Sequence, residues 1–239
     1  MTYLFISDLH LSPEHPRLVR GFLDLLDTYQ QQQTQLYILG DWFNAWLGDD
    51  DNSAWLDHIV DALRAFTAAG NQIFFLVGNR DFALGQSFLD RFNGQLLPEI
   101  YQLNIADQRI RLEHGDLLCT DDLSYQRFRK VIRHPWVLKT LTCLPLKTRQ
   151  KIAQGFRKKS IQTKQVKSYD IMDVNQQAVI TALSDVDVLI HGHTHRPDLH
   201  TLLNKQRIVL GDWREDQATI LLLNVKNNMI EYQMKNWSY

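Results

Sequence analysis

Residues 3–10 of this chain, YLFISDLH, join a short apolar run directly to an aspartate and a histidine. The run Tyr3–Ile6 is aromatic and branched, which predicts a buried β-strand. Asp8 and His10 follow where that strand would end. In α/β folds, ligands bind at the carboxyl ends of the strands. The stretch therefore predicts the first strand of an α/β fold and the first part of a functional site.

The alternation of strand and helix continues beyond this stretch. Helix-length patterns at Pro16–Gln31 and Ser53–Ala69 alternate with strand-like runs at Leu36–Leu39 and Ile73–Val77. Further strand-like runs follow at Ile110–Glu113, Val186–Ile190, Ile208–Leu210 and Ile220–Val225. Because no helical pattern separates the last of these, we expect an α/β sandwich whose later strands close as an antiparallel portion.

Four more polar motifs follow predicted strands. They are Gly40-Asp41, Gly78-Asn79-Arg80-Asp81, His114-Gly115-Asp116 and His191-Gly192-His193-Thr194-His195. Each motif alone occurs by chance, and a lone histidine at a strand end is usually structural. Together they predict five loops that converge on one site, with glycines that let the backbone approach a ligand closely. Oxygen and nitrogen ligands of this kind suit Mn²⁺, Fe²⁺ or Zn²⁺.

Length and composition indicate an ordinary globular protein. The chain has 239 residues, of which 44% are hydrophobic and 22% charged, enough for one large domain or a domain with an insertion. No apolar run approaches the length of a membrane span, and the N-terminus lacks a basic leader, so we expect a cytosolic protein. Cys119 and Cys143 form no pattern, and we expect two thiols.

The charges are distributed unevenly along the chain. Residues 127–167 contain thirteen Lys or Arg and no Asp or Glu, although the net charge of the whole chain is −1. Prolines at 135 and 145 and interspersed apolar residues predict two or three helices here. We expect residues 123–167 to form a basic, amphipathic helical cap inserted in a core of residues 1–122 and 168–239.

The cap has three possible interpretations. It could be a solvated basic face, or a nucleic-acid surface whose Lys and Arg neutralise phosphates. It could also meet anionic lipid and present an apolar channel to acyl chains. The interspersed Phe128, Trp136 and Leu138 favour the lipid interpretation, because the stretch lacks an aromatic stacking array for bases.

The five motifs resemble, in order and spacing, those of the calcineurin-like metallophosphoesterase superfamily. The resemblance implies that one metal is held by Asp8, His10, Asp41 and His195. It also implies that Asp41 bridges to a second metal completed by Asn79, His114 and His193. Two such ions generate a nucleophile from water near neutral pH, so no Ser or Cys nucleophile is needed.

Arg80 departs from the common superfamily pattern, in which His follows the Gly-Asn pair. Arginine cannot donate a proton at neutral pH, but it can clamp a phosphate bidentately. A leaving group that is itself a phosphate needs little protonation. Arg80 therefore favours cleavage of a diphosphate over hydrolysis of a monoester.

Longer motifs, at residues 39–51, 78–82, 114–122, 171–176 and 191–197, resemble the UDP-2,3-diacylglucosamine hydrolase family of lipid A biosynthesis. The resemblance runs nearly end to end. It implies hydrolysis of UDP-2,3-diacylglucosamine to UMP and 2,3-diacylglucosamine 1-phosphate by water attacking the uridine-side phosphorus, with two Mn²⁺ per chain. It also implies a peripheral position on the cytoplasmic face of the inner membrane.

Residue roles carried over by position complete this hypothesis. The implied catalytic residues are Asn79, Arg80 and His114. The implied substrate contacts are Asn79, Arg80, Asp122, Ser160, Lys164, Lys167 and His193.

Two other functions compete with this one: a nuclease or nucleotide phosphodiesterase of the same superfamily, and a non-catalytic binding scaffold. The complete set of seven ligands counts against the scaffold, and we expect neither a nucleic acid nor an obligate protein partner. We interpret Asp49–Asp51 as a solvated turn. Trp46, Phe82 and Tyr125 fit either an acyl channel or the core.

Overall fold

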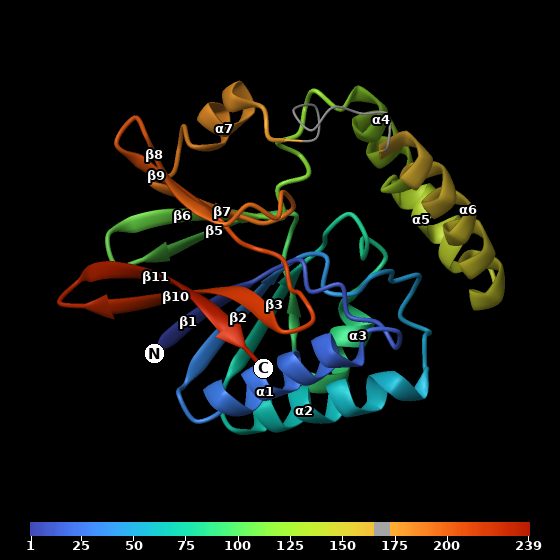
Figure 1. The fold of residues 1–239 in the computed structure, drawn as a ribbon, viewed down its shortest axis with the longest axis horizontal. Coiled ribbons are helices and arrows are strands. Elements are labelled where there is room, and N and C mark those ends of the chain that lie inside the picture. The colour runs from blue at the N-terminus through green and yellow to red at the C-terminus, as the bar shows by residue number, and fades with distance from the viewer. Residues whose placement is uncertain (165–172) are drawn as a thin grey trace.

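Two β-sheets packed face to face form the centre of the molecule (Figure 1). The computed structural model describes the backbone of residues 1–164 and 173–239 and the side chains of residues 1–155 and 173–239. The first sheet contains β1 (Thr2–Ile6), β2 (Thr34–Leu39), β3 (Gln72–Leu76), β4 (Gln95–Leu96), β10 (Gln217–Lys226) and β11 (Met229–Ser238). Its strand order is β11-β10-β1-β2-β3-β4.

The second sheet has the strand order β5-β6-β7-β9-β8. Its strands are β5 (Ile100–Ile105), β6 (Gln108–Glu113), β7 (Val188–His191), β8 (Asp198–Leu202) and β9 (Lys205–Val209). The helices of the described residues are α1 (Pro16–Tyr29), α2 (Asp57–Ala68), α3 (Gln86–Leu89), α4 (Leu123–Ile132), α5 (Pro135–Thr142), α6 (Leu146–Lys164) and α7 (Gln176–Ala182), with short 3₁₀ turns at Ala54–Leu56 and Asp90–Phe92.

Alternating side chains of the first sheet are buried on opposite faces, because successive residues of a strand point to opposite sides. In β1, Leu4 and Ile6 pack among the helices, whereas Phe5 packs against the second sheet. The same division recurs in β10, where Leu222 faces the helices and Leu221 the second sheet. Both faces of the first sheet are therefore core.

Helices cover the outer faces of the sandwich (Figure 1). The apolar faces of α1 and α2 pack on the first sheet through residues such as Phe22 and Leu63. Helix α7 packs on the second sheet, where Val179 contacts the cluster around Leu189. This arrangement confirms the predicted α/β sandwich.

One detail of the predicted sheet was wrong. We expected the later strands to pair antiparallel, and β10 does pair antiparallel with β1 and β11. However, β6, β7 and β9 are parallel neighbours. The long connection between β6 and β7 brings the chain back to the edge of the sheet where β6 began, so β7 runs in the same direction as β6, and β8 runs antiparallel to β9 at the sheet edge.

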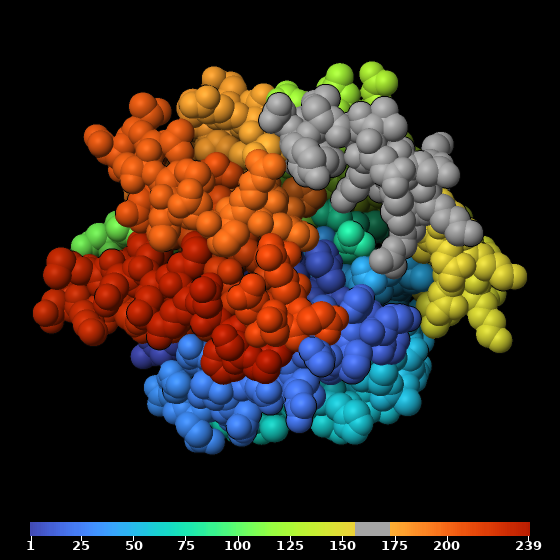
Figure 2. All heavy atoms as spheres, in the orientation of Figure 1, coloured from blue at the N-terminus to red at the C-terminus, as the bar shows by residue number. Residues whose placement is uncertain are grey.

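Helices α4, α5 and α6 follow one another over residues 123–164 and lie to one side of the sheets (Figure 1). Asp122 caps α4, accepting a hydrogen bond from the backbone N–H of Tyr125, and Pro135 begins α5. In the face shown in Figure 2, the yellow part of α6 lies at the side of the molecule, beside the blue and cyan early segments of the chain. The proposed cap boundary at residue 167 lies outside the described residues.

Among the residues that the structure describes, no helix combines the length and apolarity needed to cross a membrane. Cys119 is buried and Cys143 is exposed, and no disulfide joins these two described residues.

Candidate metal centre

The loops that follow β1, β2, β3, β6 and β7 meet at one site. Contacts join loops of both sheets: His195, after β7, has Nε2 at 3.2 Å from Asp8 Oδ1, after β1. Likewise His114 Nε2, after β6, is 2.9 Å from Asn79 Oδ1, after β3. The parallel strands of the two sheets therefore deliver their carboxyl ends to a common place, as predicted from the motifs.

Five of the predicted ligands have left-handed backbone conformations. Their φ angles lie between 52° and 71°, at Asp8, His10, Asp41, His193 and His195. Few residues other than glycine adopt this region, and backbone strain of this kind clusters at functional sites, where the surrounding structure maintains it. Other non-glycine residues with positive φ lie in turns elsewhere, but five of the seven predicted ligands share this conformation.

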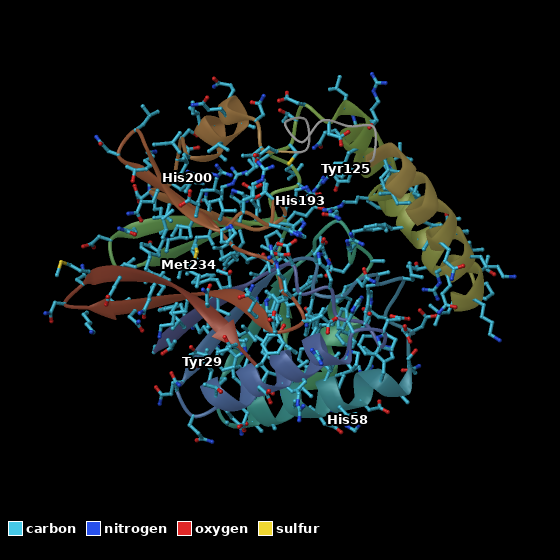
Figure 3. The ribbon with its side chains drawn as sticks, in the orientation of Figure 1. Tyr29, His58, Tyr125, His193, His200 and Met234 are labelled. Atoms are coloured by element: carbon cyan, nitrogen blue, oxygen red, sulfur yellow. The ribbon has the colours of Figure 1, made fainter. Side chains whose placement is uncertain are left out.

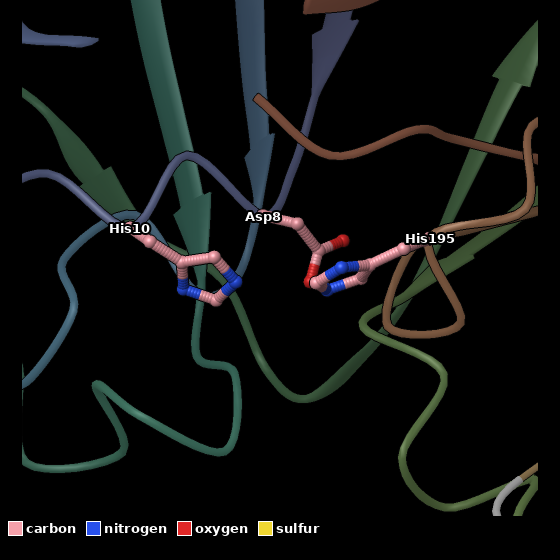
Figure 4. Close-up of side chains that lie close together, drawn as sticks. All are labelled: Asp8, His10 and His195. Carbon is pink, nitrogen blue, oxygen red and sulfur yellow. The ribbon is translucent and has the colours of Figure 1, made fainter. Parts of the chain in front are cut away.

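One group of ligand atoms comes from Asp8, His10 and His195, with the Asp8 carboxylate between the two imidazoles (Figure 4). These atoms all lie within 4.8 Å of one another. Both ring nitrogens of His10 are buried, and neither has a hydrogen-bond partner among the described residues. Burial lowers the pKa of His10 to about 3, so its imidazole is neutral and has a free lone pair. An orphaned, neutral histidine beside a buried carboxylate fits a metal ligand.

A second group comes from Asp8, Asp41 and His114, again within 4.8 Å. His114 Nδ1 donates to the carbonyl of Leu39 at 2.9 Å, so its Nε2 is the atom that faces the site. That Nε2 lies 3.2 Å from His193 Nδ1. Burial lowers the pKa of His193 to about 3, which leaves this imidazole neutral as well.

The carboxylate of Asp41 faces both groups. Its Oδ2 is 3.9 Å from His10 Nδ1, and its Oδ1 is 3.6 Å from His114 Nε2. A carboxylate whose two oxygens face different histidines has the geometry of a bridging ligand. Burial raises the pKa of Asp41, because the cost of a negative charge in the interior exceeds what nearby His114 and Arg80 compensate.

The electrostatics of the site favour a cation. Burial opposes a positive charge on His114 and on His195, yet nearby carboxylates raise the pKa of both, to about 10 for His195. For His195 the carboxylates are Asp212 and Asp8. The same negative field would favour a bound metal ion over these protons. The donor set therefore fits divalent metal ions.

Asp81 holds two of the loops together. Its carboxylate is fully buried and accepts hydrogen bonds from the backbone N–H groups of Gly78 at 2.7 Å, Asp41 at 3.2 Å and Trp42 at 2.7 Å. Burial raises its pKa to about 7. At Gly40, where φ is +81°, a Cβ atom would lie 2.6 Å from the Cα of Gly78, so only glycine permits this approach.

Arg80 lies at the edge of the site. Its backbone N–H donates to Asp41 Oδ1 at 2.8 Å, and its Nη1 donates to Asn44 Oδ1 at 3.2 Å. The guanidinium Nε is 3.7 Å from Asp41 Oδ2, and about a third of the side chain is exposed (32%). The cation is thus placed beside the ligands and remains accessible to an anionic substrate.

His191, the first histidine of the last motif, uses both ring nitrogens in hydrogen bonds within the chain. Its Nδ1 donates to the carbonyl of Gly192 at 2.8 Å, and its Nε2 accepts from Nε of Arg207 at 2.9 Å. Because both ring nitrogens are used, His191 has a structural role. The motif alone does not distinguish it from His193 and His195.

Asp212 is a site residue that sequence reasoning missed. Its Oδ2 lies 3.6 Å from Nδ1 of His195, on the side of the imidazole away from Asp8. A carboxylate in this position orients a metal-binding histidine. The signal was present, because Gly211-Asp212 after β9 repeats the pattern of Gly40-Asp41 after β2.

The acidic run at residues 49–51 differs from the expected solvated turn. Asp49 accepts hydrogen bonds from Trp46 Nε1 and from the backbone N–H groups of Gly85 and Phe88. Asp50 forms an ion pair with Arg149. Trp46 is buried in the core rather than lining a channel.

The structure describes only some of the predicted substrate contacts in and beside the cap. Asp122 is buried at the start of α4, where its Oδ1 also accepts from Oγ of Ser124 at 2.8 Å. Tyr125 of the same helix lies beside His193, with ring centroids 6.4 Å apart (Figure 3). Ser160 and Lys164 belong to α6, but their side chains are outside the described part, and Lys167 lies outside the described residues.

Comparison with known proteins agrees with this geometry. Residues 1–197 match the family described as calcineurin-like phosphoesterase. The chain is 47% identical over 223 residues to the UDP-2,3-diacylglucosamine hydrolase of Tolumonas auensis, covering 90% of this chain and 91% of the relative. Relatives of the same name from Haemophilus influenzae (strain ATCC 51907 / DSM 11121 / KW20 / Rd) and Escherichia coli O7:K1 are 45% and 42% identical, each over 92% of this chain and 94% of the relative.

A solved structure shares the fold. It is that of a novel archaeal phosphodiesterase, with a TM-score of 0.50 and 14% identity, covering 98% of this chain and 100% of that one.

Proposed function

This chain belongs to the calcineurin-like phosphoesterase family, and from that membership we propose that it hydrolyses the diphosphate of UDP-2,3-diacylglucosamine. The products are UMP and 2,3-diacylglucosamine 1-phosphate, an intermediate of lipid A biosynthesis, and water attacks the uridine-side phosphorus. The relatives at 42–47% identity, which carry this activity in their names, support the substrate. The observation that carries the proposal is the convergence of seven ligand side chains beside Arg80.

The site would hold two divalent ions through Asp8, His10, Asp41, Asn79, His114, His193 and His195. Bound there, such ions supply an activated water and withdraw charge from the phosphoryl oxygens. We propose Mn²⁺, which suits mixed oxygen and nitrogen ligands. Neither cysteine is needed, and burial raises the pKa of Cys119 to about 12, so it remains a neutral thiol.

Arg80 and Asn79 contact the substrate phosphate in this mechanism. The Arg80 guanidinium balances charge on the phosphoryl oxygens but gives no proton to the leaving group. The leaving group is a sugar phosphate, which departs as an anion and needs little protonation. This chemistry supports a diphosphate over a phosphomonoester as the substrate.

We assign the cap to capture of the lipid part of the substrate. Leu123, Val131 and Trp136 are 64%, 62% and 74% exposed, and the basic residues Lys130 and Lys139 are exposed nearby in the chain. Exposed apolar side chains beside basic ones suit the surface of an anionic membrane. We therefore propose a peripheral position on the cytoplasmic face of the inner membrane. Asp122, Ser160, Lys164, Lys167 and His193 remain proposed substrate contacts.

Release of UMP tests the proposal directly. Chelator-stripped protein is assayed with and without added Mn²⁺ on UDP-2,3-diacylglucosamine, on unacylated UDP-N-acetylglucosamine and on a short DNA. We expect Mn²⁺-dependent release from the acylated substrate alone. Cleavage of DNA without release of UMP would retain the metal centre and overturn the substrate.

A further inference from the structure

A buried ionic cluster joins the cap to the loops of the metal centre. At its centre is Asp116, which lies two residues after His114 and is almost fully buried. Its Oδ2 accepts hydrogen bonds from Tyr125 Oη at 2.5 Å, Arg129 Nε at 2.8 Å and Arg133 Nη2 at 3.0 Å. All three donors belong to α4 or to the residue that ends it. Helix α4 is therefore attached to the loop that carries His114.

Glu99, which directly precedes β5, completes the cluster. It accepts from Arg129 Nη2 at 2.8 Å and from Arg133 Nη1. The two arginines thus share the same two carboxylates, and both guanidiniums are nearly buried, with side chains 11% and 8% exposed. Such charge-assisted, multidentate contacts fix geometry more strictly than single neutral hydrogen bonds.

Arg133 makes two contacts with the loop after β3 that are absent for Arg129 among the described residues, and one is with the ring of Phe82, whose centroid is 6.0 Å from the guanidinium carbon. Its Nη2 also donates to the backbone carbonyl of Gly78 at 2.8 Å. Gly78 immediately precedes Asn79, whose Oδ1 is 2.9 Å from His114 Nε2. One guanidinium therefore links the loop of Asn79 and Arg80 to Asp116, and through Asp116 to the loop of His114.

We propose that Arg133 is a positioning residue for the reaction, holding the Asn79–Arg80 loop at its working distance from His114. It acts from the cap, so docking of α4 and the geometry of this loop depend on the same side chain. The proposal rests on the proposed function only for its choice of substrate. A displacement of roughly 1 Å in a reacting group can lower a rate by about 100-fold.

Arg129 provides a matched control. It lies on the same helix, is buried to a similar extent and pairs with both carboxylates, but it has no contact with Gly78 among the described residues. If the cluster only stabilises the fold, the two arginines should be equivalent. If Arg133 positions the loop, only its replacement should alter the metal centre.

The experiment compares Arg133→Gln with Arg129→Gln. We expect similar losses of Tm, a kcat for UMP release that is roughly 10- to 100-fold lower in Arg133→Gln, and little difference in KM. Calorimetric titration of the stripped proteins with Mn²⁺ should show one of the two ions bound roughly 10-fold more weakly in Arg133→Gln. Equal kcat and equal Mn²⁺ affinity in the two variants would overturn the proposal.

Two additions keep the test decisive. Should either glutamine variant fail to fold, Arg133→Lys and Arg129→Lys retain the buried charge, but a lysine cannot span both carboxylates and the Gly78 carbonyl. Should the unmodified protein release no UMP, the proposed function fails, while the Mn²⁺ titration still decides the role of Arg133.

A double variant tests whether Arg133 acts through Asn79. In an Asn79→Ala background, Arg133→Gln should weaken Mn²⁺ binding no further, and an additive loss would contradict positioning through Asn79.

Discussion

The loops of the metal centre and helix α5 of the cap differ in how deeply their side chains are buried. Asp8 and Asp41 are almost fully buried, and their carboxylates contact histidines or backbone N–H groups of other loops. In α5, none of the described residues is buried, and Trp136 is 74% exposed. The loops of the candidate site thus contact one another within the chain, whereas the side chains of α5 are largely exposed.

This difference in burial agrees with the proposed division between chemistry in the core and substrate capture by the cap. The ligands are held in strained conformations by a closely packed core, which suits groups that must keep a fixed geometry. The cap is attached through a few arginines, among them Arg149, which is buried and bonds to the carbonyl of Leu47 and to Asp50. Anchors of this kind fix the cap while leaving apolar side chains such as Trp136 exposed.

The largest effect should follow from replacing a ligand of the metal centre. Asp41→Asn removes one negative charge from between the two groups of ligands, so we expect a loss of kcat of roughly 10³-fold or more together with weaker metal binding. UMP release and metal content per chain are the measurements. Asp51→Asn is the matched control, because Asp51 bonds to Ser53 in a surface loop and should be replaced at little cost. A fully active Asp41→Asn enzyme would exclude a bridging role.

A smaller effect is expected from Arg80→His at the edge of the site. The change removes a permanent cation from beside the phosphate, so diphosphate hydrolysis should slow by roughly 10²-fold. Rates on UDP-2,3-diacylglucosamine and on a phosphomonoester should be measured for both proteins. The leaving-group argument is wrong if Arg80→His leaves diphosphate turnover unchanged and the unmodified protein prefers phosphomonoesters.

In the cap, Trp136→Ser should affect membrane binding rather than chemistry. Losing one exposed indole should lower partitioning onto anionic vesicles by roughly 10-fold, while turnover of detergent-dispersed substrate changes little. Flotation with liposomes measures the first quantity and UMP release the second. Thr140→Ala, an exposed change on the same helix, is the control. Equal flotation of the Trp136→Ser variant and the unmodified protein, or no flotation of either at low salt, would count against a lipid-facing α5.

The smallest effect concerns the ion pairs of Glu99 with Arg129 and Arg133, which join the cap to the loops of the metal centre. Partial burial raises the pKa of Glu99, but Arg133 and Arg129 outweigh it and hold the pKa below its ordinary value of 4.5. A depressed pKa stabilises the fold above that ordinary value, and the contribution is lost as the pH falls through the folded-state pKa. Because Glu99 is 39% exposed, we expect Glu99→Gln to cost only ~1 kcal/mol at pH 7.

Urea unfolding of the metal-free proteins at pH 7 and at acidic pH measures this difference. The stabilities of Glu99→Gln and the unmodified protein should converge as the pH falls below the ordinary pKa of a glutamate. A gap that persists unchanged in acid would show that the ion pairs of Glu99 do not stabilise the junction.

Much of the site could be predicted because its signals are local. Asp8, His10 and Asp41 each follow an apolar run within a few residues, so the strand end and the ligand are identified together. Strands β4, β5, β8 and β11 were not predicted, because β4 has only two residues and the others have largely exposed side chains and a weak apolar pattern. These strands are specified by pairing with a neighbour, as β11 pairs with β10 over ten residues.

The sequence by itself determined the sandwich of strands and helices, the order of the five ligand motifs and the concentration of basic charge in the cap. Only the tertiary structure decided which histidine nitrogens face the site, that Asp212 lies beside His195, and that Arg133 contacts the carbonyl of Gly78. The physical reason is the sequence separation over which each kind of interaction acts. Apolar periodicity and turn residues act between neighbours in the chain, whereas a hydrogen bond between Arg133 and Gly78 spans fifty-five positions and exists only once the sheets and helices have packed.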